Sequence, residues 1–75
     1  MAAEIRPDSI VAARKAAGMT LEDAARVCGV TRQTYKGREF SPREFRLGEL
    51  ADMYESMSDP ARLLMRNAVA EIFLD

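Results

Sequence analysis

Residues 20–39 have the sequence TLEDAARVCGVTRQTYKGRE, in which two helix-start signals are separated by a glycine. The Thr20 hydroxyl can accept a hydrogen bond from the backbone N–H of Asp23, and the Asp23 carboxylate can bond back to residue 20. Gly29 can adopt the left-handed conformation that ends a helix in a sharp bend. Thr31 can cap a second helix directly after this bend. The stretch therefore predicts two short helices joined by a tight turn.

The small and apolar residues of this stretch predict the buried side of each helix. Ala24 and Ala25 let another helix approach closely, and Cys28, four residues after Ala24, lies on the same face as a small hydrophobe. Val30 is expected to fill the turn, and Tyr35 falls on the inner face of the second helix. The side chains that then point outward are those of Arg32, Gln33 and Lys36.

This spacing of capped helix, glycine and capped helix resembles the Cro and phage-repressor type of helix-turn-helix protein. The positions that match the family's small helix residue, turn glycine, turn hydrophobe and buried helix hydrophobe are Ala25, Gly29, Val30 and Tyr35. Arg14 is similar to the family's first-helix arginine, and Glu39 to the glutamate that closes its recognition helix. The stretch EFSPREFRLGELADMY, residues 39–54, resembles the loop and fourth helix of phage-encoded members. The resemblance extends over residues 10–54.

Three positions depart from the pattern of that family. Leu21 stands where many members have a glutamine that contacts a DNA phosphate. Gly37 lies among the outward positions that often carry a base-reading side chain. Arg38 stands where the family usually has a large hydrophobe. At these positions the family's contacts are not carried over to this chain.

The resemblance implies an all-α domain of five helices, similar to the DNA-binding domain of lambda repressor, with residues 1–75 forming one domain. Its central helix-turn-helix would occupy about residues 20–39. Cap and proline signals set the other bounds. A first helix is expected from Pro7 or Asp8 to Gly18, a third ending at Lys36 or preferably Arg38, a turn at residues 41–44, a fourth helix over Leu47 to Met57, and a last one over Pro60 to Phe73.

Apolar spacing predicts the buried faces of the later helices. Phe45 is expected to pack under the fourth helix, whose predicted buried face consists of Leu47, Leu50, Ala51 and Tyr54. The core face of the last helix is predicted to consist of Leu64, Ala68 and Ile72. The last helix has more apolar residues than this face needs, which suggests a homodimer. The predicted dimer interface consists of Leu63, Ile72, Phe73 and Leu74, and the alternative is that the core needs all of them.

By the same resemblance, the third helix enters the major groove of DNA, where its first outward residues meet the edges of bases. Arg32 can pair with a guanine through two hydrogen bonds, and Gln33 can do the same with an adenine. Lys36, one turn after Arg32, can reach a base or a phosphate. Gly37 would allow the backbone to approach closely, or would contact nothing. The alternative is that the three side chains are ordinary solvated residues.

Contacts with DNA phosphates are expected at two helix starts, where backbone N–H groups point at anions, and in the loop after the third helix. The residues concerned are Thr20, Thr31, Arg43 and Arg46. The resemblance gives Arg14 a different role, in which it pairs with Glu39 and ties the first helix to the end of the third. The alternative is an exposed arginine of little energetic weight.

The net charge of −1 does not by itself favour DNA binding, but the distribution of charge does. From Arg32 to Arg46 there are five basic and two acidic residues, whereas from Glu49 to Asp75 there are six acidic and two basic residues. Charges within about 8–10 Å of a phosphate matter most at physiological salt. The local patch therefore counts for more than the total. The alternative is an ordinary solvated face of mixed charge.

The composition disfavours several classes of function. One cysteine and no histidine leave no plausible metal site and no internal disulfide. No nucleophile–base pair is visible, so we expect no enzyme, no cofactor and no small-molecule ligand. No apolar run is long enough for a membrane span, and residues 1–10 lack the apolar core of a signal peptide. The expected location is the cytoplasm.

The expected function is that of a sequence-specific transcriptional regulator of the Cro or repressor type, of phage or prophage origin. It would bind double-stranded operator DNA as a homodimer and repress by excluding polymerase. The alternative is a protein-interaction module on the same scaffold, such as an antitoxin or anti-repressor, with weak or no DNA binding. The modest local charge, Gly37 and the absence of a glutamine at position 21 favour this alternative.

Overall fold

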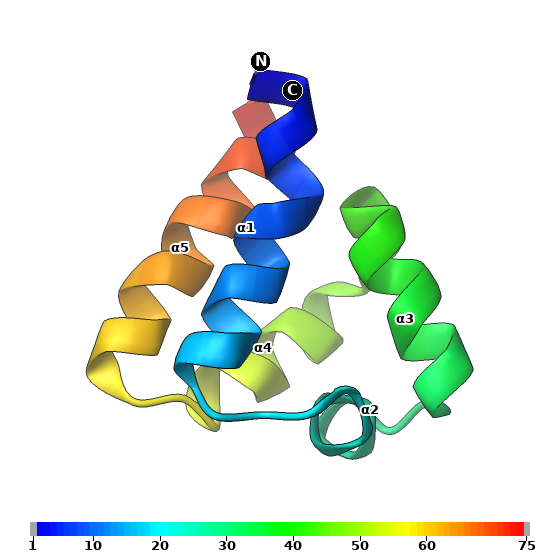
Figure 1. The fold of residues 1–75 in the computed structure, drawn as a ribbon. Helices are drawn as coiled ribbons and strands as arrows, with labels where there is room; N and C mark the ends of the chain where they lie inside the picture. Colours follow the sequence, from blue (N-terminus) through cyan, green and yellow to red (C-terminus); the bar gives the residue numbers. More distant parts are fainter. Residues whose placement is uncertain (1, 75) are drawn as a thin grey trace.

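The structure, a computed structural model, describes residues 2–74, with side chains over residues 9–73, and this part of the chain is all-helical (Figure 1). Five α-helices and one 3₁₀ turn follow one another, as the sequence predicted. Their bounds are α1 Ala2–Ala16, α2 Leu21–Cys28, α3 Arg32–Phe40, η1 Pro42–Glu44, α4 Leu47–Glu55 and α5 Asp59–Leu74.

The α2–turn–α3 unit is formed by the local signals of its own sequence. Thr20 Oγ1 accepts the N–H of Asp23 at 3.0 Å, and Asp23 Oδ2 accepts the N–H of Thr20 at 3.0 Å. Gly29 ends α2 in the left-handed region with φ +73°, a conformation that other residues adopt only with strain. Thr31 Oγ1 accepts the N–H of Thr34 at 3.1 Å and starts α3. The predicted caps and turn are confirmed.

The first and last helices lie side by side on the part of the molecule away from this unit (Figure 1). Buried Ile10 and Ala13 face the core from α1, and small or flexible residues of α5 do so from the other side. Near their outer ends, Ser9 Oγ donates to Glu71 Oε1 at 2.9 Å. The packing of α1 on α5 closes the fold around the centre of the chain.

An aromatic pair connects α3 with the loop that follows it. Tyr35 is fully buried, and its ring meets that of Phe45 edge to face, with centroids 5.8 Å apart and planes at 68°. Such pairs stabilise a core beyond the area they bury. Burial also raises the pKa of the Tyr35 hydroxyl, which stays protonated. The predicted inward positions of both rings are confirmed.

Two helix bounds differ from the prediction. The first helix begins at Ala2 rather than at Pro7 or Asp8. Residues 2–4 are alanines and a glutamate, which have a high intrinsic preference for helix. The third helix ends at Phe40 rather than at Lys36 or Arg38, so Gly37 lies inside it. The packing around Tyr35 outweighs the helix penalty of about 1 kcal/mol for a glycine.

The buried face of α4 is also different from the predicted one. Leu50 and Met53 are buried, but Leu47 is 75% exposed and Ala51 is exposed as well. The reason is Glu49, which is itself buried because it pairs with a residue of α3. Its inward position rotates the helix and turns Leu47 outward. The fourth helix also ends two residues earlier than expected, at Glu55.

The core face of α5 follows a neighbouring apolar stripe rather than the predicted one. Ala61, Met65 and Ala68 are buried, whereas Leu64 is 40% exposed and Ile72 is only half-buried. Both stripes share Ala68. The observed stripe contains two alanines, which let α1 approach closely, and a leucine at the contact would hold the helices apart.

Candidate nucleic-acid interface

The two sides of α3 differ completely in their surroundings. Arg32, Gln33 and Lys36 are exposed, and so is Gly37. A Cβ built at Gly37 would meet no atom within 4 Å. The opposite side carries Tyr35, which is fully buried, and two charged residues near the C-terminal end. The first two turns of α3 therefore present polar groups to solvent from a helix fixed on its other side.

The first fixing contact is an ion pair between Arg14 of α1 and Glu39 of α3. Arg14 Nε donates to Glu39 Oε2 at 2.6 Å, and both side chains are buried. Arg14 Nη1 also donates to the carbonyl of Met19 at 2.9 Å. The residues paired in the sequence analysis are thus paired in the structure. Through Arg14, the end of α3 is connected both to α1 and to the loop that leads into α2.

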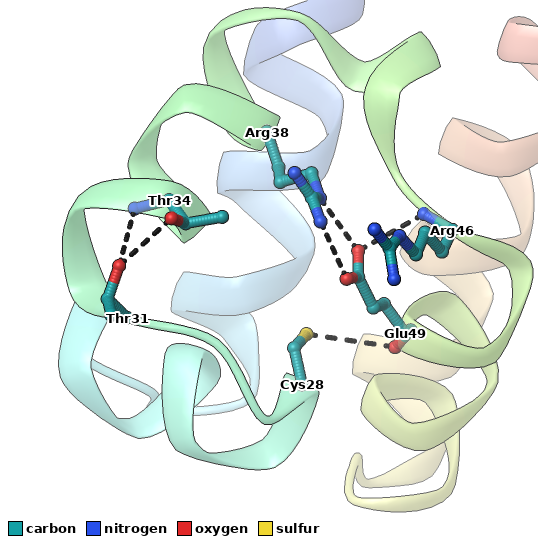
Figure 2. A network of polar contacts seen from close by, with 6 residues as sticks. All are labelled: Cys28, Thr31, Thr34, Arg38, Arg46 and Glu49. Carbon is teal, nitrogen blue, oxygen red and sulfur yellow. Dashed lines mark hydrogen bonds and ion pairs between the residues drawn. The ribbon is translucent and has the colours of Figure 1, made fainter.

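The second fixing contact joins Arg38 of α3 to Glu49 of α4, and the sequence analysis missed it (Figure 2). Arg38 Nε donates to Glu49 Oε1 at 2.8 Å, and Arg38 Nη2 donates to Glu49 Oε2 at 2.9 Å. Glu49 Oε1 also accepts the backbone N–H of Arg46 at 3.1 Å. The hydrogen bond from Arg38 holds the pKa of Glu49 below its ordinary value, against the effect of burial. A charged residue on the inner side of α3 was the available signal, since it needs an opposite charge on a facing helix.

Comparison with known families decides what kind of unit this is. The model of the helix-turn-helix family matches residues 10–54, which run from α1 into α4. The chain belongs to the helix-turn-helix family of the XRE and Cro type. It is thus a member of a family of DNA-binding regulators. Neither a curated protein nor a solved structure matches the chain significantly.

In this helix-turn-helix protein, the expected phosphate contacts fall at two places. Thr20 and Arg32 line one shallow depression between the starts of α2 and α3, together with Leu21 and Glu22. Arg43 and Arg46 are exposed on the loop between α3 and α4. The depression therefore contains an acidic side chain beside the expected phosphate contact, which the sequence analysis did not consider.

The hydroxyls of Thr31 and Thr34, at the start of α3, form a hydrogen bond with each other (Figure 2). Thr31 Oγ1 accepts the N–H of Thr34 and donates to Thr34 Oγ1 at 2.9 Å. The Thr31 side chain is therefore occupied by capping. Thr34 is exposed and keeps a hydroxyl proton that can be donated outward. The sequence analysis missed Thr34, although its position between Arg32 and Lys36 on a capped helix was a usable signal.

Some charged side chains near α3 are paired with other helices and are therefore not available to a binding partner. Arg38 and Glu39 are both engaged in ion pairs with other helices. The ion pairs within the described part of the chain include none of the basic residues Arg32, Lys36, Arg43 and Arg46. The unpaired charge along this stretch is therefore positive, with only Glu44 against it.

Cys28 is half-buried beside the network of Arg38 and Glu49 (Figure 2). Its Sγ lies 3.8 Å from the carbonyl oxygen of Glu49. Burial raises the pKa of the Cys28 thiol to about 11. The thiol therefore stays protonated and fills space between α2 and α4, as expected of a small hydrophobe.

The residues assigned to a dimer interface have mixed surroundings. Phe73 is 74% exposed and Leu63 is 59% exposed, whereas Ile72 is half-buried. The side chain of Leu74 lies outside the described residues. Next to Phe73, a hollow of about 150 Å³ opens between η1, α4 and α5. Its apolar lining includes Phe45, Leu47, Leu50, Val69 and Ile72.

None of the helices described is both long enough and apolar enough to cross a membrane. Among the side chains described, those of residues 9–73, no three or more histidine, cysteine or acidic residues are grouped as they would be around a metal ion.

Proposed function

We propose that the protein is a sequence-specific repressor of phage or prophage origin, which acts in the cytoplasm and inserts the first two turns of α3 into the major groove of an operator. One observation carries the proposal: α3 is fixed along one side by Tyr35 and two ion pairs, while Arg32, Gln33 and Lys36 are exposed on the other. A rigid helix with exposed polar side chains is what groove recognition requires. Bound near a promoter, it would exclude polymerase.

In the proposed complex, side chains of α3 specify the bases. Arg32 donates to guanine O6 and N7, and Gln33 bonds to adenine N6 and N7. Lys36 reaches a base or a phosphate one turn further along. The open space around Gly37 lets the backbone approach the bases closely. These are the contacts that would give the protein its sequence preference.

Other residues would position the helix by contacting phosphates without specifying sequence. Arg43 and Arg46 approach one strand from the loop after α3. Thr20 and Thr31 lie at the starts of α2 and α3, where backbone N–H groups point at anions. Because the Thr31 hydroxyl is engaged in capping, its contact would be made by the backbone, with the Thr34 hydroxyl beside it.

The proposal is tested by selecting duplexes from a random pool with the purified protein. We expect a short enriched motif, and Arg32→Ala should lose preference at one base pair of it. Lys15→Ala, which removes an exposed lysine from α1, is the matched control and should enrich the wild-type motif. A wild-type protein that enriches no motif would overturn the proposal.

We also propose that the regulator binds its operator as a symmetric dimer through α5 and the adjoining hollow. The exposed Phe73 and Leu63, and the apolar lining that includes exposed Leu47, support this. Large apolar side chains exposed on a small domain favour association. A single helix contacts too few base pairs to identify a genomic site, and two copies would read two half-sites.

A protein-interaction module, such as an antitoxin or anti-repressor, is the second candidate. Glu22 favours it, because this acidic side chain shares a depression with Arg32 at the place where a phosphate would lie. A gel shift on random duplex DNA at low and moderate salt separates the candidates. A DNA-binding regulator should bind at low salt and lose affinity as salt rises. An interaction module should not bind at either salt concentration.

A further inference from the structure

We propose that Arg38 and Glu49 are positioning residues, which set the orientation of α3 against α4 and through it the affinity for the operator, without touching DNA. The inference rests on the proposed function, since it assumes that α3 enters the major groove. It concerns Arg38, which stands where the family usually has a large hydrophobe and which the structure pairs with Glu49.

The two hydrogen bonds between Arg38 and Glu49 restrict the relative orientation of the two side chains. Arg38 engages both carboxylate oxygens of Glu49, at 2.8 and 2.9 Å, through two nitrogens of one planar guanidinium group. A fork of this kind fixes the relative planes of the two groups as well as their distance. The backbone N–H of Arg46 holds one of the same oxygens at 3.1 Å. Glu49 is therefore fixed to the start of α4 and to the inner side of α3 together (Figure 2).

A hydrophobic side chain at position 38 would hold α3 in a different way. Apolar contact has no preferred direction, so it would not fix the relative planes of two groups as the fork does. In this chain Glu39, the next residue, is held from the other side by Arg14 at 2.6 Å. The C-terminal half of α3 is thus held on two sides by hydrogen-bonded ion pairs.

A small change in the angle of α3 at Arg38 becomes a larger displacement at the proposed base-reading residues, because they lie further along the helix. Arg32 precedes Arg38 by six residues, which is about 9 Å along a helix axis. A tilt of about 10° at Arg38 would move Arg32 by about 1.6 Å at that distance. A hydrogen bond to a base tolerates only a few tenths of an ångström. A small loosening at Arg38 would therefore break the contacts of Arg32 and Gln33.

Arg38 itself is poorly placed for direct contact with DNA. Its side chain is 16% exposed, and its charge is balanced by Glu49. The exposed basic residues on the same stretch make no such pair within the described part of the chain. Removing Arg38 and Glu49 together should leave the number of phosphate contacts unchanged.

The test compares charge-matched variants on two DNA duplexes. Arg38→Met with Glu49→Gln keeps the net charge but removes the pair, and Arg38→Lys keeps the charge but removes the fork. Lys15→Met with Glu55→Gln is the control, because both residues are exposed and lie on α1 and α4. Affinity is measured for the duplex selected by the wild-type protein and for a scrambled duplex, over a range of salt concentrations. Circular dichroism checks that each variant is folded.

We expect the first double variant and Arg38→Lys each to bind the selected duplex about tenfold more weakly, equivalent to one lost base contact. Affinity for the scrambled duplex and the salt slope should stay as in the wild type. If the double variant does not fold, Arg38→Lys alone decides. The control pair should bind both duplexes like the wild type.

Wild-type affinity of both variants for the selected duplex would overturn the inference and reduce the pair to a purely structural contact. Equal losses on both duplexes with a shallower salt slope would also overturn it, because Arg38 would then bind a phosphate. A wild-type protein that does not distinguish the two duplexes would overturn the proposed function, and the inference would fall with it.

Discussion

Arg38 and Glu39 are adjacent in α3 and carry opposite charges, yet each forms an ion pair with a different helix, Arg38 with Glu49 and Glu39 with Arg14. The two pairs approach α3 from α4 and from α1, so α3 is connected to both neighbours near its end. Its first two turns are left with exposed polar side chains. The predictions below test what this arrangement does for stability and for DNA binding.

The residues proposed to contact bases and those proposed to contact phosphates should respond differently to truncation. Arg32→Ala or Gln33→Ala should weaken binding to the selected duplex by about 1–3 kcal/mol and relax the preference at one base pair. Arg43→Ala should weaken binding to all sequences equally and make the salt dependence shallower. Fluorescence anisotropy on selected and scrambled duplexes measures both. Identical changes for Arg32→Ala and Arg43→Ala on the two duplexes would contradict the groove assignment.

The buried pair of Arg14 and Glu39 should contribute measurably to folding. Glu39→Ala leaves a buried guanidinium without its carboxylate and should cost about 1–3 kcal/mol of unfolding free energy. A double-mutant cycle with Arg14→Ala, measured by urea denaturation, gives the coupling between the two residues. Asp23 and Arg26 form an exposed pair on α2, and Arg26→Ala serves as the control with a small effect. Zero coupling between Arg14 and Glu39 would show that water screens the pair in solution.

Glu49 should make the fold sensitive to acid. Its pKa is lowered in the folded state, chiefly by the hydrogen bond from Arg38, relative to the ordinary value of 4.5. The stabilisation is therefore complete above that ordinary value and is lost as the pH falls through the lower, folded-state pKa. Thermal melts of the wild type and of Glu49→Gln between pH 7 and pH 3 test this. The difference in Tm between them should shrink as the pH falls, and parallel curves would contradict the prediction.

Glu22 should oppose DNA binding, because it lies in the depression that contains Thr20 and Arg32. Glu22→Gln should strengthen binding to any duplex by a few fold at low salt, with the gain disappearing at high salt as charges are screened. Glu55→Gln removes an exposed acid from α4 and is the control. If both substitutions had the same effect, the gain would come from net charge alone, and the depression would not face DNA.

The exposed Phe73 should matter for association and little for folding. Phe73→Asp should give a folded monomer with much weaker operator binding, because two half-sites would no longer be occupied together. Analytical ultracentrifugation at micromolar concentration, without and with operator DNA, measures the change. A wild-type monomer that binds a single half-site with no second copy joining it would end the dimer proposal.

Local signals were sufficient to predict the centre of the molecule. Thr20 with Asp23, Gly29 and Thr31 each determine the backbone within a few residues of themselves, and all act in the structure as their sequence indicates. Tyr35 was also placed correctly, because helical spacing relates it directly to the cap at Thr31. These features need no knowledge of the rest of the chain.

The wrong predictions concern side chains whose burial depends on residues that are distant in the sequence. No pairing was predicted for Glu49, but Arg38 draws it inward, which turns Leu47 out and shifts the whole face of α4. On α5, two apolar stripes share Ala68, and only the proximity of α1 selects the one with Met65. The order of polar and apolar residues in the sequence does not show that Arg38 pairs with Glu49 or that α1 packs against α5.

The side-by-side packing of α1 and α5 has a consequence for how the chain is made. Proteins are synthesised from the amino end, so α1, α2 and α3 leave the ribosome before α5. Until α5 emerges, its apolar residues cannot cover Ile10 and Ala13. The 42 residues that separate α1 from α5 in the sequence must also be brought into place before the two helices meet. We expect stable folding to wait for the last helix, and a nascent chain that ends before Ala61 to remain vulnerable to proteases.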